Sequence, residues 1–175
     1  MKKNKGPIIW SLLFAAFVTT SCNRSEADPR ANINAIALPS KKISISINKP
    51  ENEVYQYTSN PQNFPKWLAS VDSVTQQSDT VWTAETNFGN IEIELSPANN
   101  LGIVDHIVKL PNGAVVNNPL RILKSGTGSE VVFTLFHLPN KTEQEFDQDA
   151  KLVEADLKTL KQILETQQSE TLAGE

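Results

Sequence analysis

The chain has 175 residues, and its 16 basic and 20 acidic side chains give a formal net charge of −4. An acidic chain lacks the concentrated lysine and arginine that displace counterions from nucleic acid, so the composition argues against a nucleic-acid partner. Residues 1–21 hold three lysines and no acid, so the remaining chain has 13 basic and 20 acidic residues and a net charge of −7. That remainder is long enough for one domain with its own core.

The N-terminus has the layout of a secretory signal. Three lysines precede an apolar run over residues 8–18, and small polar residues then lead to Cys22. Positive charge, a short apolar stretch and a small-residue cleavage site are typical of exported proteins. The run is too short for a membrane span, which needs about 20 apolar residues. We therefore interpret residues 1–21 as a signal peptide, with a short buried helix as the alternative.

Cys22 is the only cysteine in the sequence, so it has no partner for an internal disulfide. The run Thr-Thr-Ser-Cys resembles a bacterial lipobox, although Thr19 stands where leucine or valine is usual and Val18 lies one place earlier. The resemblance implies that Cys22 is lipidated, and more than one acyl chain makes such anchoring durable. It implies a lipoprotein of the bacterial cell envelope. Asn23, rather than aspartate, favours the outer membrane or cell surface. Cleavage near Ser21 that leaves a free thiol is the alternative.

The rest of the chain divides into three parts. Residues 22–42 are polar, contain two prolines and show no sustained period. We expect them to form a flexible tether with a reach of about 25 Å. The folded domain is expected over residues 43–166, and the polar residues 167–175 are expected to form a disordered tail.

The first predicted elements are one strand and two short helices. Isoleucines alternate with polar residues over 43–48, which is the period of a half-buried strand. Pro50 then opens a helix over residues 51–58, with two glutamates in its first turn as the helix dipole prefers. Residues 62–67 predict a further turn of helix.

Six consecutive antiparallel strands are predicted next, because turn signals recur about every 8–12 residues, as in a meander. Asn112-Gly113 is the pair that two-residue hairpin turns favour. The strands are expected over residues 71–76, 81–86, 91–95, 102–110, 114–123 and 130–138.

The last element has a helical period. Thr142 and Glu145 form a capping-box pattern. One apolar stripe follows, with spacings of 4, 3, 4, 3 and 4, made by Phe146, Ala150, Val153, Leu157, Leu160 and Leu164. A helix of about 23 residues is roughly 35 Å long, and a ten-residue strand spans about 33 Å. The helix can therefore cover the concave face of a curled sheet, an arrangement that commonly leaves a cavity for an apolar ligand.

Five segments of the domain resemble the START/polyketide-cyclase-like (SRPBCC) superfamily, at residues 45–55, 60–67, 104–106, 128–136 and 146–161. The resemblance implies an α+β helix-grip fold. In that fold a curved antiparallel sheet of about seven strands wraps around a long C-terminal helix, and two short helices follow the first strand. Members include lipid carriers, hormone receptors and aromatase/cyclases, so the fold does not choose the function.

Three functions follow from this resemblance. The first is membrane-anchored binding or transport of a small hydrophobic or amphipathic ligand between sheet and helix, without a cofactor. The second is a cyclase- or hydrolase-like enzyme that uses a pocket histidine as general base. The third is a structural or partner-binding lipoprotein whose pocket is filled by its own side chains.

The two histidines are the candidate catalytic residues. Asp105 and His106 are adjacent on a predicted strand, so they point to opposite faces and do not form a preassembled dyad. His106 and His137 are candidate general bases. A structural hydrogen bond within the strand is the alternative for His106. His137 is expected near the end of a strand and approaches His106 only if the sheet brings the two together. Two histidines without ligand spacing do not predict a metal site.

The expected ligand-binding residues lie on several elements. Trp67 is expected near the pocket entrance, where the resembling segment lies in related proteins, or else as a structural anchor of the short helices. Arg121 stands among apolar residues and is expected to hold a ligand carboxylate or to bridge to a surface acid. The expected set is Trp67, Trp82, His106, Arg121, Phe133 and Leu157.

Overall fold

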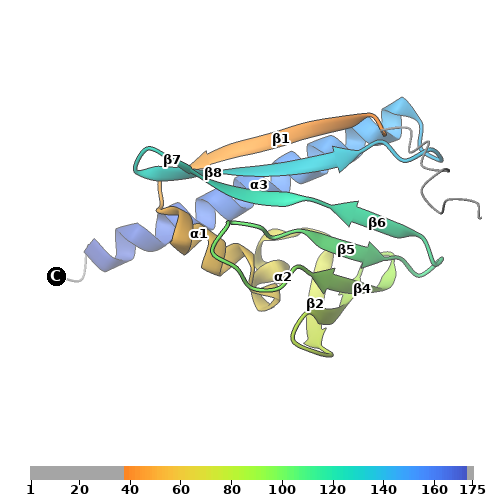
Figure 1. Ribbon diagram of the computed structural model, residues 1–175, viewed down its shortest axis with the longest axis horizontal. Helices are drawn as coiled ribbons and strands as arrows, with labels where there is room; N and C mark the ends of the chain where they lie inside the picture. The colour runs from red at the N-terminus through yellow and green to blue at the C-terminus, as the bar shows by residue number, and fades with distance from the viewer. Residues whose placement is uncertain (1–37, 173–175) are drawn as a thin grey trace, which may run out of the picture. The chain divides into compact units, whose positions relative to one another are not determined.

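The computed structural model describes residues 38–172, with side chains up to residue 166. The expected signal peptide, Cys22 and most of the tether lie outside the described residues. Figure 1 shows the order of the elements along the chain. The strands are β1 (Ser40–Ile47), β2 (Val71–Gln76), β3 (Val81–Thr86), β4 (Gly89–Leu95), β5 (His106–Lys109), β6 (Val115–Asn118), β7 (Leu120–Ser125) and β8 (Gly128–Phe136). The helices are α1 (Glu51–Thr58), the 3-10 turn η1 (Pro61–Asn63), α2 (Phe64–Trp67) and α3 (Glu143–Leu172).

The structure confirms the α+β helix-grip fold. Its strands form two antiparallel sheets, one in the order β1-β8-β7 and one in the order β2-β3-β4-β5-β6. The long helix α3 runs along β1 and β8 on one face of the three-stranded sheet (Figure 1). The short helices α1, η1 and α2 follow β1, as expected.

Eight strands form instead of about seven, because the segment predicted as one strand over 114–123 is divided at Pro119. Before it, β6 pairs with β5; after it, β7 pairs with β8. Proline has no N–H to donate to a ladder, while the carbonyl of Pro119 still accepts from Thr134 N at 2.9 Å. The chain therefore passes from one sheet to the other at this residue.

The strand predicted over 102–110 is also shorter, since only His106–Lys109 pairs as β5. The preceding residues lie beside β7 instead. Val104 N donates to Leu120 O at 2.9 Å, and Ile122 N donates to Gly102 O at 2.8 Å. Residues 102–105 thus join the two sheets.

The domain is longer at both ends than the sequence indicates. β1 begins at Ser40, where polar residues assigned to the tether pair with Thr134, Leu135 and Phe136 of β8. That pairing depends on a partner strand more than 90 residues away, so no local period reveals it. At the other end, α3 continues to Leu172, into the segment expected to be a tail.

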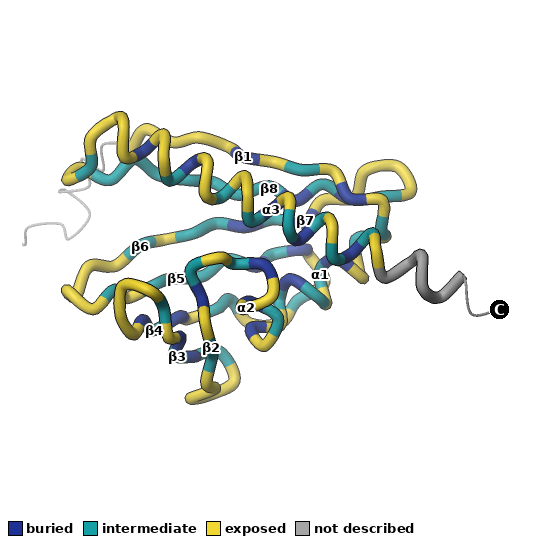
Figure 2. The backbone as a smooth tube through the Cα atoms, turned by 180° about the vertical axis from the view of Figure 1, so that it is seen from behind, coloured by how far each residue is buried: buried dark blue, intermediate teal, exposed yellow. Residues whose placement is uncertain are grey.

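The core lies between α3 and the concave faces of the sheets. The apolar stripe of α3 is buried at Phe146, Ala150, Leu157, Leu160 and Leu164, and Figure 2 shows buried positions recurring along this helix. Burying each large apolar side chain contributes about 1.5–3 kcal/mol. The predicted capping box forms at the start of α3. Thr142 N donates to the Glu145 carboxylate at 2.8 Å, and Glu145 N donates to Thr142 Oγ1 at 3.3 Å.

Candidate ligand-binding cavity

A cavity of about 210 Å³ lies between the concave face of the five-stranded sheet, α2 and α3. Its walls combine side chains from both sheets, on β2 and on β4 to β8, with side chains from α2 and α3. Most of them are aliphatic or aromatic, which is typical of small-molecule sites. The lining residues are Phe64, Trp67, Leu68, Ser70, Val71, Phe88, Ile91, Ile93, Val104, His106, Val108, Asn118, Leu120, Phe133, Val153, Asp156 and Leu157.

A second, open hollow of about 760 Å³ adjoins this cavity, and we call it the vestibule. The two share Ser70, Phe88, Val108 and Asn118 as lining residues. At the vestibule, Phe88 is 54% exposed and Leu152 is 62% exposed. The shared residues form the boundary between the cavity and the vestibule, which we call the mouth of the cavity, and exposed apolar side chains border it.

Two hairpin turns shape the vestibule beside Phe88. Gly89 follows Phe88 in the β3–β4 turn and has φ of +117°, which favours glycine. A Cβ at Gly89 would lie 3.1 Å from Pro111 Cγ in the β5–β6 turn. The two turns therefore pack closely, and this contact positions Phe88 at the mouth of the cavity.

His106 supplies one polar group of the cavity wall. Its Nδ1 lies 3.2 Å from Val104 O, and because a carbonyl only accepts, Nδ1 carries the proton of the neutral ring. Burial lowers the pKa of His106, which favours that neutral ring. Nε2 is then an acceptor, and it makes no hydrogen bond to another side chain or backbone group in the described part of the chain. Asn118 lies directly opposite on β6.

Asp156 and Trp67 supply the polar groups on the helical side. Asp156 Oδ1 accepts a hydrogen bond from Ala69 N at 3.0 Å, and burial raises the pKa of this carboxyl. The Trp67 ring packs edge-on against Phe64, with 5.9 Å between ring centroids. Its Nε1 is buried without a hydrogen-bond partner among the described residues.

Arg121 lies on the opposite face of the sheet from the cavity. It follows Leu120, which lines the cavity, and successive strand residues point to opposite faces. Its guanidinium forms an ion pair with Asp105, and Asp105 Oδ1 also accepts from Leu120 N at 3.0 Å. Of the two expectations for Arg121, the bridge to an acid is the one that the structure shows.

Of the other predicted ligand-binding residues, four line the cavity and Trp82 does not. Trp67, His106, Phe133 and Leu157 line the cavity. Trp82 is buried on β3 but lines a separate hollow of about 150 Å³ beneath α1 and η1.

His137 directly follows the end of β8 and does not line the cavity. Its Nε2 is 2.8 Å from Lys141 O, and its ring stacks on Phe146 with 4.6 Å between centroids. The structure therefore does not bring the two histidines together at one site.

Sequence reasoning missed Asn118 and Asp156. Asp156 lies three residues after Val153 and one before Leu157, so it falls on the apolar stripe of α3. An acid on the apolar face of a helix was the signal that could have indicated it. Asn118 is the register partner of His106, and that pairing depends on the sheet.

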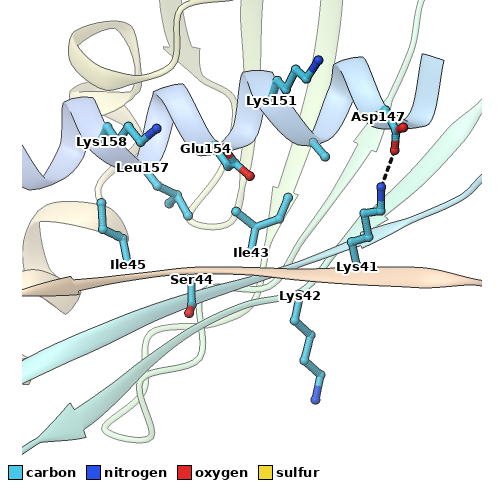
Figure 3. Close-up of a pocket in the computed structure, with 11 residues that line it drawn as sticks. Lys41, Lys42, Ile43, Ser44, Ile45, Asp147, Lys151, Glu154, Leu157 and Lys158 are labelled. Carbon is cyan, nitrogen blue, oxygen red and sulfur yellow. Dashed lines mark hydrogen bonds and ion pairs between the residues drawn. The ribbon is translucent and has the colours of Figure 1, made fainter. Parts of the chain in front are cut away.

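A larger groove of about 640 Å³ runs between the outer edge of β1 and α3. Figure 3 shows Ile43 and Ile45 pointing toward α3, Lys42 pointing away, and Lys41 paired with Asp147. Charged side chains, lysine above all, protect an edge strand from pairing with other chains. We assign the groove to this protection, because its walls are charged and it shares only Leu157 with the cavity.

The described residues contain no helix that is both long and apolar enough to span a membrane. Within the same residues, no group of three or more histidine, cysteine, aspartate or glutamate side chains is arranged to hold a metal ion.

A curved antiparallel sheet gripping a C-terminal helix, with a cavity between them, is the fold of START-type proteins, and comparison with solved structures confirms it. A START superfamily protein from Mycobacterium smegmatis matches with a TM-score of 0.58 at 10% identity, over 73% of this chain and 97% of that one. Ara h 8.0201 matches with a TM-score of 0.58 at 11% identity, over 74% and 99%. The Aha1 dimer from Colwellia psychrerythraea matches with a TM-score of 0.57 at 16% identity, over 73% and 96%.

These likenesses establish the fold alone, because the sequence identities are low. No protein-family model and no curated protein matches the sequence.

Proposed function

We propose that this protein is a membrane-anchored carrier of a small hydrophobic or amphipathic ligand. The observation that carries the proposal is the apolar cavity of about 210 Å³ that adjoins an open vestibule. An engineered apolar cavity of about 150 Å³ holds benzene. The cavity therefore suits a ligand part of about one ring, with any longer part lying in the vestibule.

Binding rather than catalysis is favoured by the surroundings of His106. A histidine that acts as general base is commonly oriented by a carboxylate on its second nitrogen. Here Nδ1 faces the carbonyl of Val104, while the neighbouring Asp105 is paired with Arg121 on the other face. His106 is suited to accept a hydrogen bond from a bound molecule.

Native mass spectrometry of the protein purified from its own source, followed by organic extraction, tests the carrier function. A copurifying small apolar compound, or uptake of added aromatic and lipid probes at micromolar concentration, is expected. Failure to take up any apolar probe at tens of micromolar would contradict the proposal.

The anchor is tested separately with Cys22→Ser. The lipobox-like sequence supports lipidation of Cys22, and the substitution removes the only thiol. The variant is expected to move from the membrane fraction to the soluble fraction. A variant that stays with the membrane would show that Cys22 does not carry the anchor.

A further inference from the structure

We infer that the cavity selects uncharged ligands that carry a hydroxyl group, such as alcohols and phenols, against carboxylates with the same apolar skeleton. This inference rests on the proposed carrier function. It narrows the ligand class by the charges and hydrogen-bonding groups that the cavity wall presents.

The charge of the wall is the first argument. Asp156 is the one acidic residue that lines the cavity, and none of its described lining residues is lysine or arginine. Arg121, the side chain expected to hold a ligand carboxylate, is paired with Asp105 on the other face of the sheet. In the vestibule, Lys141 is paired with Asp149. A ligand carboxylate would therefore meet the like charge of the half-buried Asp156 and no free cation, and repulsion between charges is stronger there than in bulk water.

The hydrogen-bonding groups are the second argument. His106 Nε2 is an acceptor, because Nδ1 holds the ring proton against Val104 O. The Asp156 carboxylate is acceptor-only, and Ala69 N occupies its Oδ1. Both groups need a donor from the ligand, which a hydroxyl supplies and a carboxylate does not. Asn118, Ser70 and Trp67 Nε1, which has no hydrogen-bond partner among the described residues, can donate to a ligand. A hydroxyl accepts as well as donates, so these donors are satisfied by either ligand class and do not discriminate between them.

Three probes of nearly equal size separate the possibilities: 4-propylphenol, 4-propylbenzoate and propylbenzene. Their binding to the full chain is measured by calorimetry at pH 8, where the phenol is neutral and the benzoate is charged. The phenol is expected to bind at least about tenfold more tightly than the benzoate, which corresponds to about 1.4 kcal/mol. Propylbenzene, which lacks the hydroxyl, is expected to bind between them.

Asp156→Asn tests the source of the selection. Asparagine keeps an acceptor for Ala69 N and removes the charge, so the benzoate should gain at least about fivefold in affinity while the phenol changes less. Glu154→Gln is the matched control. It removes a carboxylate two residues earlier on α3, from the outer groove instead of the cavity, and should change neither affinity.

His106→Phe tests the acceptor. The variant should lose the advantage of the phenol over propylbenzene and keep the binding of propylbenzene itself. Equal binding of phenol and benzoate by the unmodified protein would overturn the inference and leave the carrier function standing. An absence of binding by all three probes, by contrast, would overturn the carrier function as well.

Discussion

Filling the cavity from within should separate ligand binding from stability. Val153 is half-buried on α3 and lines the cavity, so Val153→Phe directs a ring into a space of about 210 Å³. Four added carbons contribute about 3 kcal/mol of burial at about 0.8 kcal/mol each. Overpacking strain costs about 1–3 kcal/mol. The free energy of unfolding should therefore stay the same or rise by up to about 2 kcal/mol.

Ligand affinity should move in the opposite direction. A benzene ring fits a volume of about 150 Å³, so the new side chain takes up most of the cavity. The affinity for a one-ring probe is expected to fall at least tenfold, measured by calorimetry beside urea denaturation of the same preparation. Val153→Ala is the matched control. It enlarges the cavity, costs about 1–3 kcal/mol of stability and should retain binding.

The Val153→Phe variant is informative because its stability and its ligand affinity are expected to change in opposite directions. A variant that is merely damaged loses stability and affinity together. If Val153→Phe binds the probe as tightly as the unmodified protein, the cavity is not the ligand site. If it loses more than about 2 kcal/mol of stability, the space beside Val153 does not accept a side chain, and the reasoning is refuted.

Three further predictions concern stability. Asp105→Ala should lower the free energy of unfolding by about 1–3 kcal/mol, because the buried Leu120 N–H loses its acceptor. Asp105→Asn keeps an acceptor and should cost clearly less in urea titrations; equal losses would contradict this role. Thr142→Ala should cost about 0.5–2 kcal/mol in the same titrations through loss of the cap on α3, and an unchanged midpoint would show that the cap contributes nothing. Burial lowers the pKa of His106, so below about pH 6.5 the unfolded chain binds the proton more readily than the folded one. The stability linked to His106 is therefore complete above about pH 6.5 and declines as the pH falls toward the native pKa. In urea titrations across this pH range, the free energy of unfolding of His106→Phe should depend less on pH than that of the unmodified protein. If the pH dependence is unchanged, another titratable group causes it.

The sequence predicts the local elements of this fold well. The stripe of α3 and its capping box depend on residues three or four apart, and both form as expected. The division of the sheet at Pro119 was not predicted. Pro119 is itself a signal in the sequence, because proline is disfavoured inside a central strand. The partners of the two strands on either side, β5 for one and β8 for the other, depend on the sheet and not on a pattern within residues 114–123.

The site was only partly predictable for a related reason. Leu157 could be placed on the inward face from the helix period, while strand alternation placed His106 and Asp105 on opposite faces without deciding which faces inward. His106 and Leu157 both line the cavity. Arg121 was expected there as well, although the same alternation places it on the other face from Leu120. Which inward side chains reach one cavity depends on packing between elements. Trp82 is buried near the cavity wall and still lies outside it.

The position at which the chain enters the domain affects how a ligand would pass between the membrane and the cavity. Ser40 pairs with Phe136, and His137 N donates to Pro39 O at 2.8 Å. Because Phe136 also lines the vestibule, the first strand begins beside the mouth of the cavity. Residues 23–37 separate Cys22 from the described domain, and a chain of that length spans at most about 55 Å. If Cys22 is lipidated as proposed, the anchor limits the distance between the domain and the bilayer surface. The effective concentration of the carrier at the membrane is then high. Ligand exchange with the membrane therefore requires no diffusion of the carrier through solvent.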